Sequence, residues 1–102
     1  MTTGGLDFSI EEKDGATILR LSGSLVSERI THLIPQIEDT LRKRPPDLIV
    51  DLVKLTSIDD PGVAVIATLR EKTIFRGGYF SICNVGENIS EVLSFHHFDQ
   101  YI

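Results

Sequence analysis

Apolar and polar residues alternate at the start of the chain, in two arms that flank a short polar turn. The apolar face of the first arm consists of Leu6, Phe8 and Ile10. A second alternating arm runs from Thr17 to Leu21, and we expect it to close at Ser22-Gly23. The Asp14-Gly15 pair between the arms readily adopts a positive φ, so the pattern predicts a β-hairpin.

Helical spacing replaces this alternation in the next segment. Apolar residues recur at intervals of three and four, at Ile30, Leu33, Ile34, Ile37 and Leu41. The spacing predicts a helix with Ser27 as its N-cap and Pro45-Pro46 as its stop. Because Pro35 lacks an amide donor and crowds the preceding turn, we expect a kink or a late helix start there.

A nearly continuous apolar run from Leu48 to Leu52 predicts a central strand that is covered on both faces. We expect it to pair in parallel with the second arm, since the helix between them is long enough for a right-handed crossover. A second helix is predicted from Pro61 to Phe75, with Gly77-Gly78 as its stop. A further strand within "GGYFSICNV" follows it.

The last segment predicts a third helix with Asn88 as its cap. Its inward stripe is Ile89, Val92, Leu93 and Phe98. The element order is then ββαβαβα, which predicts an α/β fold with a mixed, mainly parallel sheet of four or five strands and about three helices. We expect one domain over residues 1–102, with a disordered start over residues 1–5.

The composition and charge of the chain limit its possible functions and partners more than they limit its fold. A chain of 102 residues with 41% hydrophobic residues buries one core. The net charge of −5, with scattered Lys and Arg, argues against a nucleic-acid or anionic-membrane surface and favours a protein partner. With no signal-like start and no apolar run that could insert into a membrane, we expect a cytoplasmic protein. Cys83 is the only cysteine, and we expect it to be a small buried residue.

The most informative stretch is "LTSIDDPGVAVIATL", in which two carboxylates precede an apolar helix. Either Asp59 or Asp60 fits the N-cap, with Pro61 as the first helical residue and Gly62 permitting close approach of another chain. A carboxylate there accepts from unpaired amides and faces the positive end of the helix dipole, which is worth roughly 0.5–2 kcal/mol. On local grounds this is a well-capped helix.

Two segments give the same stretch a second meaning. The run that begins "LIVDLVKLTSIDDPGVAVIATL" resembles the STAS domain of bacterial anti-sigma-factor antagonists, in which a strand ends in a "hD-S/T-S-G-hh" segment before a helix. "ILRLSGSL" resembles the strand and turn of that family, and "RGGYFSI" fits it as well. The resemblance implies a cytosolic module that docks onto a serine-kinase anti-sigma factor, and whose phosphorylation ends that docking.

Residue by residue, the resemblance breaks at the phosphorylation site. Asp59 matches the family aspartate and Gly62 its glycine, whereas Asp60 occupies the first hydroxyl position. Pro61 occupies the second, which is the usual phosphoacceptor, and it has no hydroxyl. Val26 replaces the aspartate that kinase substrates in the family commonly carry after the leucine. We therefore expect the fold without its usual switch.

Our preferred hypothesis is a non-phosphorylatable interaction domain, with Asp60 as a permanent but imperfect mimic of phosphate. The expected partner-binding residues are Asp59, Asp60, Pro61, Gly62, Val63, Val26 and Ser27. The partner would be an anti-sigma factor or another protein. Ser57 is the nearest hydroxyl, beside Thr56, that could act as a displaced acceptor, although serine at a strand end more often bonds backbone groups.

Two other hypotheses remain open. Asp51, Asp59 and Asp60 could gather around Mg²⁺ in a receiver-like phosphotransfer protein, although the receiver's other acidic pair and its lysine have no counterpart here. The same fold could also be a subunit of a lipid-transport ATPase complex or a stress-signalling scaffold. No nucleophile and base pair is visible that would predict an enzyme, and no cofactor is indicated.

The histidines give little support for a metal site. Adjacent helical residues such as His96 and His97 point about 100° apart, and His32 lies on another helix. We expect one of the pair to cover the core edge beside Phe95 and Phe98.

The end of the sequence suggests self-association. The sequence ends at Ile102, about where related domains begin a last strand. A bare sheet edge there could support a homodimer.

Overall fold

A mixed sheet forms the body of the protein, as the computed structural model shows for residues 5–101 apart from the side chains at 27–29, 31–33 and 99. The strands, in sheet order, are β1 (Leu6–Lys13), β2 (Ala16–Leu25), β3 (Leu48–Ile58) and β4 (Phe80–Cys83). The helices are α1 (Ser27–Arg42), α2 (Asp60–Phe75), α3 (Glu87–Phe95) and a 3-10 turn, η1 (Asp99–Tyr101). β1 pairs antiparallel with β2, and the other neighbours pair in parallel. The predicted order ββαβαβα and the mixed sheet are confirmed, with four strands in the described part.

The hairpin forms as predicted, but its second strand is longer than expected. Asp14 and Gly15 adopt φ values of 54° and 81° in the turn. β2 does not close at Ser22-Gly23, because Gly23 has φ 93° and leaves room for the Gly5 carbonyl, where a side chain would clash. The N–H of Ser24 donates to that carbonyl at 3.1 Å, and the strand continues to Leu25.

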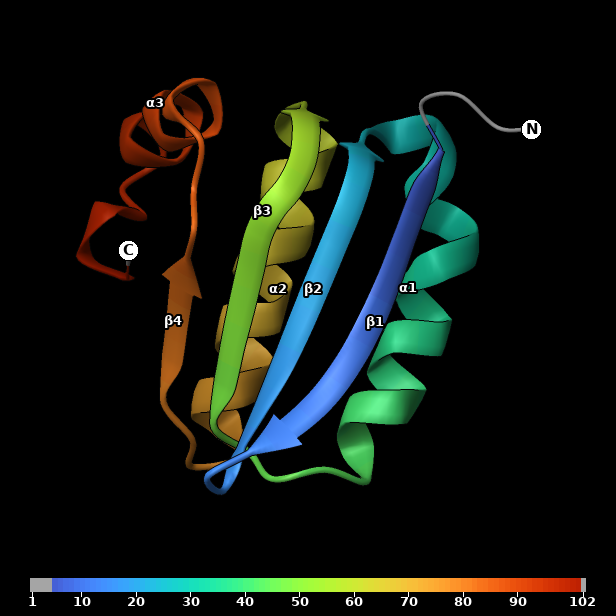
Figure 1. Ribbon diagram of the computed structural model, residues 1–102, viewed down its shortest axis with the longest axis vertical. Coiled ribbons are helices and arrows are strands. Elements are labelled where there is room, and N and C mark those ends of the chain that lie inside the picture. The colour runs from blue at the N-terminus through green and yellow to red at the C-terminus, as the bar shows by residue number, and fades with distance from the viewer. Residues whose placement is uncertain (1–4, 102) are drawn as a thin grey trace.

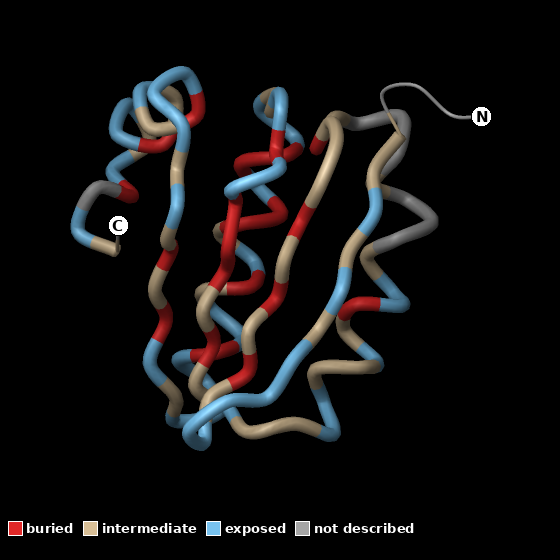
Figure 2. Tube along the Cα trace, viewed as in Figure 1, coloured by how far each residue is buried: buried red, intermediate tan, exposed pale blue. Residues whose placement is uncertain are grey.

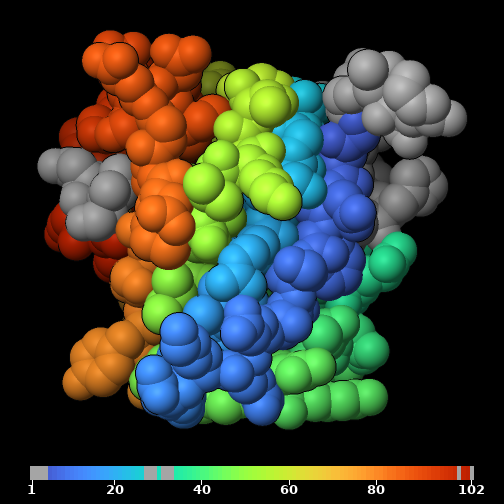
Figure 3. Space-filling model, in the orientation of Figure 1, coloured from blue at the N-terminus to red at the C-terminus, as the bar shows by residue number. Residues whose placement is uncertain are grey.

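Helices α1 and α2 lie behind the sheet, and both crossovers are right-handed (Figure 1). The buried residues gather between the helices and the sheet (Figure 2). The largest fully buried apolar side chains are Leu19, Leu21, Leu25, Ile37, Val50, Leu52, Ile66 and Leu93. The opposite sheet face carries strand side chains at the molecular surface (Figure 3). Our expectation that the central strand β3 is covered on both faces is therefore wrong.

Two of the expected helix starts also differ. The N-cap of α1 is Val26, in an extended conformation, and the helix begins at Ser27, so a late start near Pro35 is ruled out. The side chains of Ser27, His32 and Leu33 lie outside the described part. α3 begins at Glu87 after Gly86, not at an Asn88 cap. α2 stops as predicted, since the N–H of Gly78 donates to the Thr73 carbonyl at 2.9 Å.

A β-bulge in β3 breaks the alternation of inward and outward residues just after the apolar run from Leu48 to Leu52. Arg20 lies opposite Asp51 and Ser22 opposite Lys54, so two residues of β3 face one residue of β2. The Asp51 carboxylate accepts from the Val53 N–H within the bulge at 3.1 Å. The extra residue leaves both Val53 and Lys54 exposed and returns the next residue, Leu55, to the core.

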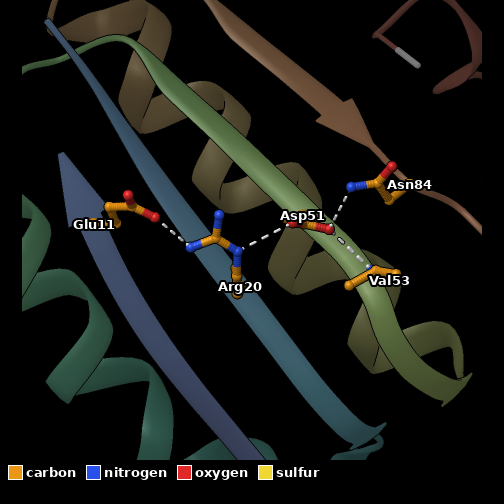
Figure 4. Close-up of polar contacts among 5 residues, drawn as sticks. All are labelled: Glu11, Arg20, Asp51, Val53 and Asn84. Carbon is orange, nitrogen blue, oxygen red and sulfur yellow. Dashed lines mark hydrogen bonds and ion pairs between the residues drawn. The ribbon is translucent and has the colours of Figure 1, made fainter. Parts of the chain in front are cut away.

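The same carboxylate joins the four strands on the open face (Figure 4). Asp51 is only 6% exposed, and it accepts from Arg20 at 3.2 Å and from the Asn84 side chain, just after β4, at 3.1 Å. Arg20 in turn donates to Glu11 on β1 at 2.6 Å. Cys83 pairs in register with Asp51 and is half-buried rather than buried as expected; burial and the nearby carboxylate raise the pKa of its thiol.

Replacing Asp51 with alanine should destabilise the protein by about 3 kcal/mol, because it removes three hydrogen bonds to a buried carboxylate. The free energy of unfolding in urea measures this loss. Asp39→Ala is the control: among the residues with described side chains, Asp39 forms an ion pair with Arg42 alone, at the surface, so the change should cost less than about 1 kcal/mol. Equal losses in the two variants would contradict a central role for Asp51.

Glu11→Gln should remove a stabilisation that depends on pH. The hydrogen bond and charge of Arg20 lower the pKa of Glu11 below its ordinary value of 4.5. A lowered folded-state pKa gives stability that is present above the ordinary value and lost as the pH falls through the folded value. Urea midpoints of the wild type and the variant should therefore differ near neutral pH and converge by about pH 3. A constant difference would argue against the ion pair.

Candidate functional site

The first turn of α2 forms an acidic mouth, which we define as Asp59, Asp60, Pro61 and Gly62 (the α2 mouth). Asp59 is the N-cap: it has extended backbone angles, and its carboxylate accepts from the Gly62 N–H at 2.9 Å. Asp60 is the first helical residue and Pro61 the second, one position later than predicted for the proline. Proline is still tolerated there, because the first amides of a helix have no partner within it.

The end of β2 fixes the position of this turn. The Leu25 carbonyl accepts from the Asp59 N–H at 3.3 Å and lies against Gly62. A Cβ on Gly62 would lie 2.1 Å from that carbonyl oxygen and 2.8 Å from Ile58. Gly62 therefore admits a strand of its own chain, so its close approach is intramolecular.

The expected partner-binding residues divide by burial. The Asp60 side chain is 89% exposed, and Pro61 beside it is also exposed. Gly62 and Val63 are buried, with Val63 only 5% exposed, so they support the turn from beneath. Val26 is half-buried and follows Leu25, which places it beside the α2 mouth. Ser27 follows it, with a side chain outside the described part.

Two hydroxyl contacts join the ends of β2 and β3 beneath the α2 mouth. Ser57 donates to the Ser24 hydroxyl at 2.9 Å, and its residue is exposed. Thr56 donates to the Gly23 carbonyl at 2.9 Å, as expected of a strand-end hydroxyl. Ser57 thus contacts a side chain instead of a backbone group, which the sequence did not predict.

Sequence reasoning also missed the neighbour of Asp60. His96, at the C-terminal end of α3, places its Nε2 atom 3.6 Å from the Asp60 carboxylate. Its ring packs edge-on against Phe95, whose side chain is 80% exposed, while Phe98 is buried. The contact brings α3 beside the α2 mouth, and no sequence spacing could have indicated it because the two residues are far apart in the chain.

An apolar groove between α1 and α2 opens beside Pro61. It has a volume of about 250 Å³ and is lined mainly by Ile30, Ile34, Pro61, Ala64, Val65 and Leu69. A charged, exposed turn next to an apolar groove is the arrangement that protein interfaces use, with polar rim and apolar centre.

The carboxylates of the phosphotransfer hypothesis do not gather at one place. Asp51 lies within β3, eight residues before Asp59, or roughly 25 Å along an extended strand. Within the described residues, no three His, Cys, Asp or Glu side chains are arranged to hold a metal ion. No helix in the described part is long and apolar enough to cross a membrane.

Comparisons with known proteins identify a family whose model matches the chain. Residues 7–102 match the STAS domain. Similar solved structures include the anti-sigma factor antagonist SpoIIAA in its unphosphorylated form, with a TM-score of 0.78, 16% identity and coverage of 93% of this chain and 84% of the other. A putative anti-sigma factor antagonist from Thermotoga maritima has a TM-score of 0.80, 23% identity and coverage of 93% and 82%.

A third similar structure comes from a different context. A sulfate transporter family protein from Wolinella succinogenes has a TM-score of 0.71, 17% identity and coverage of 86% of this chain and 71% of the other. A comparison with curated protein sequences found no match. At these identities the solved structures establish the fold alone.

Gly62→Ala should destabilise the protein by about 2–3 kcal/mol or more, because the new methyl group would overlap a backbone carbonyl that cannot move freely. Urea denaturation measures the change. Gly86→Ala is the matched control, since nothing lies within 4 Å of a Cβ there and φ is −67°. A loss in Gly62→Ala no larger than in this control would mean that the α2 mouth is not fixed by Leu25.

Proposed function

Since the chain belongs to the STAS domain family, we propose that it is a non-catalytic interaction module of the anti-sigma-factor antagonist type. It binds an anti-sigma factor with serine-kinase character in the cytoplasm, and so regulates transcription. The α2 mouth provides the contact surface, together with Val26 and Ser27. The usual phosphorylation switch is absent, so binding is controlled by the amounts of the two proteins.

One observation carries this proposal. Asp60 and Pro61 are exposed on a turn that the Asp59 cap and the Leu25 carbonyl hold in place. Pro61 stands where the resemblance puts the phosphoacceptor, so a kinase that docks here finds no hydroxyl to modify. The groove beside Pro61 offers apolar surface for the same partner.

Asp60 gives the surface a fixed negative charge. A carboxylate carries about half the charge of a phosphate and fewer acceptor oxygens. It therefore sets a constant electrostatic preference for a basic partner surface instead of a switch. Ser57 remains the alternative acceptor, although its hydroxyl is engaged with Ser24.

A second role keeps the fold and changes the assembly. The likeness to a sulfate transporter family protein shows that the fold also occurs in transport proteins. In a lipid-transport complex or a signalling scaffold, the groove between α1 and α2 would contact a fixed subunit. Copurification with an ATPase and a permease, instead of a kinase, would favour this role.

Intact-mass analysis after incubation with the host's cognate anti-sigma kinase and ATP should show no phosphate on the wild type. Pro61→Ser should gain one phosphate, because it restores a hydroxyl at the exposed second position of α2. The kinase should bind both proteins before ATP is added. Phosphate on the wild type, mapped to Ser57 or elsewhere, would contradict the loss of the switch.

Asp60→Lys should weaken binding to that kinase by at least about tenfold, since it reverses an exposed charge at the contact surface. Glu71→Lys is the matched control: it makes the same change near the other end of α2, where Glu71 is 76% exposed. Calorimetry or surface plasmon resonance measures both. Equal affinities for all three proteins would place the contact surface elsewhere.

A further inference from the structure

A stripe of three residues runs along the outer side of α3: Glu87, Glu91 and Phe95 (the α3 stripe). They are four residues apart, so they lie on one helical face. All three are exposed, and Phe95 is 80% exposed. Figure 2 shows α3 at one edge of the molecule, with exposed residues along it.

A shallow, open hollow in the surface accompanies the stripe. It is lined by Val85, Glu87, Ser90, Glu91, Ser94 and Phe95. Val85 is half-buried against the core. Together with Phe95 it forms an apolar surface, and the carboxylates of Glu87 and Glu91 lie at its edge. The hollow could therefore take an apolar side chain from outside the chain.

The charge around this hollow is unbalanced. Beyond Arg76 the sequence has no lysine or arginine. Neither Glu87 nor Glu91 has an ion-pair partner among the residues whose side chains are described. The like charges of Glu87 and Glu91, four residues apart, disfavour the helix, whereas the position of Glu87 in the first turn favours it through the helix dipole. Both carboxylates are therefore available to a cation from another molecule.

Two other exposed aromatic residues provide a contrast. Phe75 is 92% exposed and Tyr79 84% exposed, near the C-terminal end of α2. Lys72 there lies 3.7 Å from Glu38, whereas Arg76 donates to the carbonyls of Leu41 and Arg44, which satisfies its N–H groups but leaves its charge positive. The two surfaces therefore differ in sign: the unpaired charge beside Phe75 is the Arg76 cation, whereas the α3 stripe combines an exposed aromatic side chain with carboxylates that have no ion-pair partner among the described side chains.

We propose that the α3 stripe is a second docking surface, which binds a segment of a partner protein carrying Lys or Arg beside an apolar residue. The apolar residue enters the hollow between Phe95 and Val85, and the cations contact Glu87 and Glu91. The cations can also lie over the Phe95 ring. Aromatic residues at a partly desolvated centre with complementary charge around them are typical of energetically important contacts.

This surface adjoins the α2 mouth but is distinct from it. His96 follows Phe95 and contacts Asp60, so one partner could reach both surfaces. Binding at the α3 stripe requires neither an anti-sigma factor nor a kinase. The inference can therefore fail while the proposed function holds, and the reverse is also possible.

A library of random twelve-residue peptides, displayed on phage and selected on the full chain, tests the proposal. Enriched peptides should contain at least two Lys or Arg around a Leu, Phe or Trp. When added to ¹⁵N-labelled protein, a synthetic copy of the most enriched peptide should shift the amide signals of residues 85–95. Phe95→Ala and Glu91→Lys should each weaken its binding at least about tenfold.

Matched controls separate the stripe from general stickiness. Phe75→Ala removes a more exposed aromatic side chain, and Glu71→Lys makes the same charge reversal on α2. Both should bind the peptide with unchanged affinity, and the amide spectra of all four variants should show an intact fold. Selected peptides that are neutral or acidic, or that shift signals of the α2 mouth instead, would overturn the proposal.

Self-association is the other outcome that would overturn it. If light scattering shows that the wild type forms a dimer which Phe95→Ala converts to a monomer, a second copy of the chain occupies the stripe. A monomeric wild type that binds the selected peptide supports a separate partner. Absence of any enriched peptide would also count against the surface.

Discussion

The buried Asp51 carboxylate sets the geometry on which the rest of the sheet depends. It accepts the Val53 amide in the β3 bulge and binds side chains from β2 and from the end of β4. Without the extra residue of the bulge, strict alternation would turn Lys54 toward the helices and Leu55 toward solvent. Because of the bulge, β3 keeps an apolar face toward the helices along its length and ends next to Asp59, the N-cap of α2.

The candidate site follows from how the two central strands end. β2 and β3 run in parallel, so their carboxyl ends meet at the same edge of the sheet, where ligands and partners commonly bind in α/β folds. The Leu25 carbonyl accepts a hydrogen bond from the Asp59 N–H and occupies the space where a side chain at position 62 would lie. The turn is thus rigid in its backbone while its acidic side chain at Asp60 faces solvent.

Local sequence patterns predicted most of the architecture, because backbone conformation at turns and the spacing of apolar residues determine it. The Asp14-Gly15 turn, the stop of α2 and the parallel pairing of β3 all follow from residue conformations and apolar spacing. The misplaced features depend on distant contacts. Gly23 extends β2 because the Gly5 carbonyl bonds there, and Asp51 is buried within an apolar strand because Arg20 and Asn84 reach it.

The sequence could not predict how the expected binding residues divide between exposed and buried positions. Its pattern pointed to the segment from Asp59 to Val63 without separating the exposed Asp60 from the buried Val63, since burial depends on how Leu25 and Ile58 pack over the turn. Nor could it indicate His96, which α3 brings to Asp60.

Asp59 and Asp60 show how the first turn of α2 is completed without a hydroxyl side chain at its second position. Asp59 bonds the free amide of Gly62 and completes the first turn of α2, so the helix does not need a ligand or a phosphate at its N-terminus. Asp60 forms no part of that cap, and its exposed carboxylate lies 3.6 Å from His96 Nε2. Because Asp59 supplies the cap, the position between Asp60 and Gly62 tolerates proline, whose ring only has to fit a helical φ.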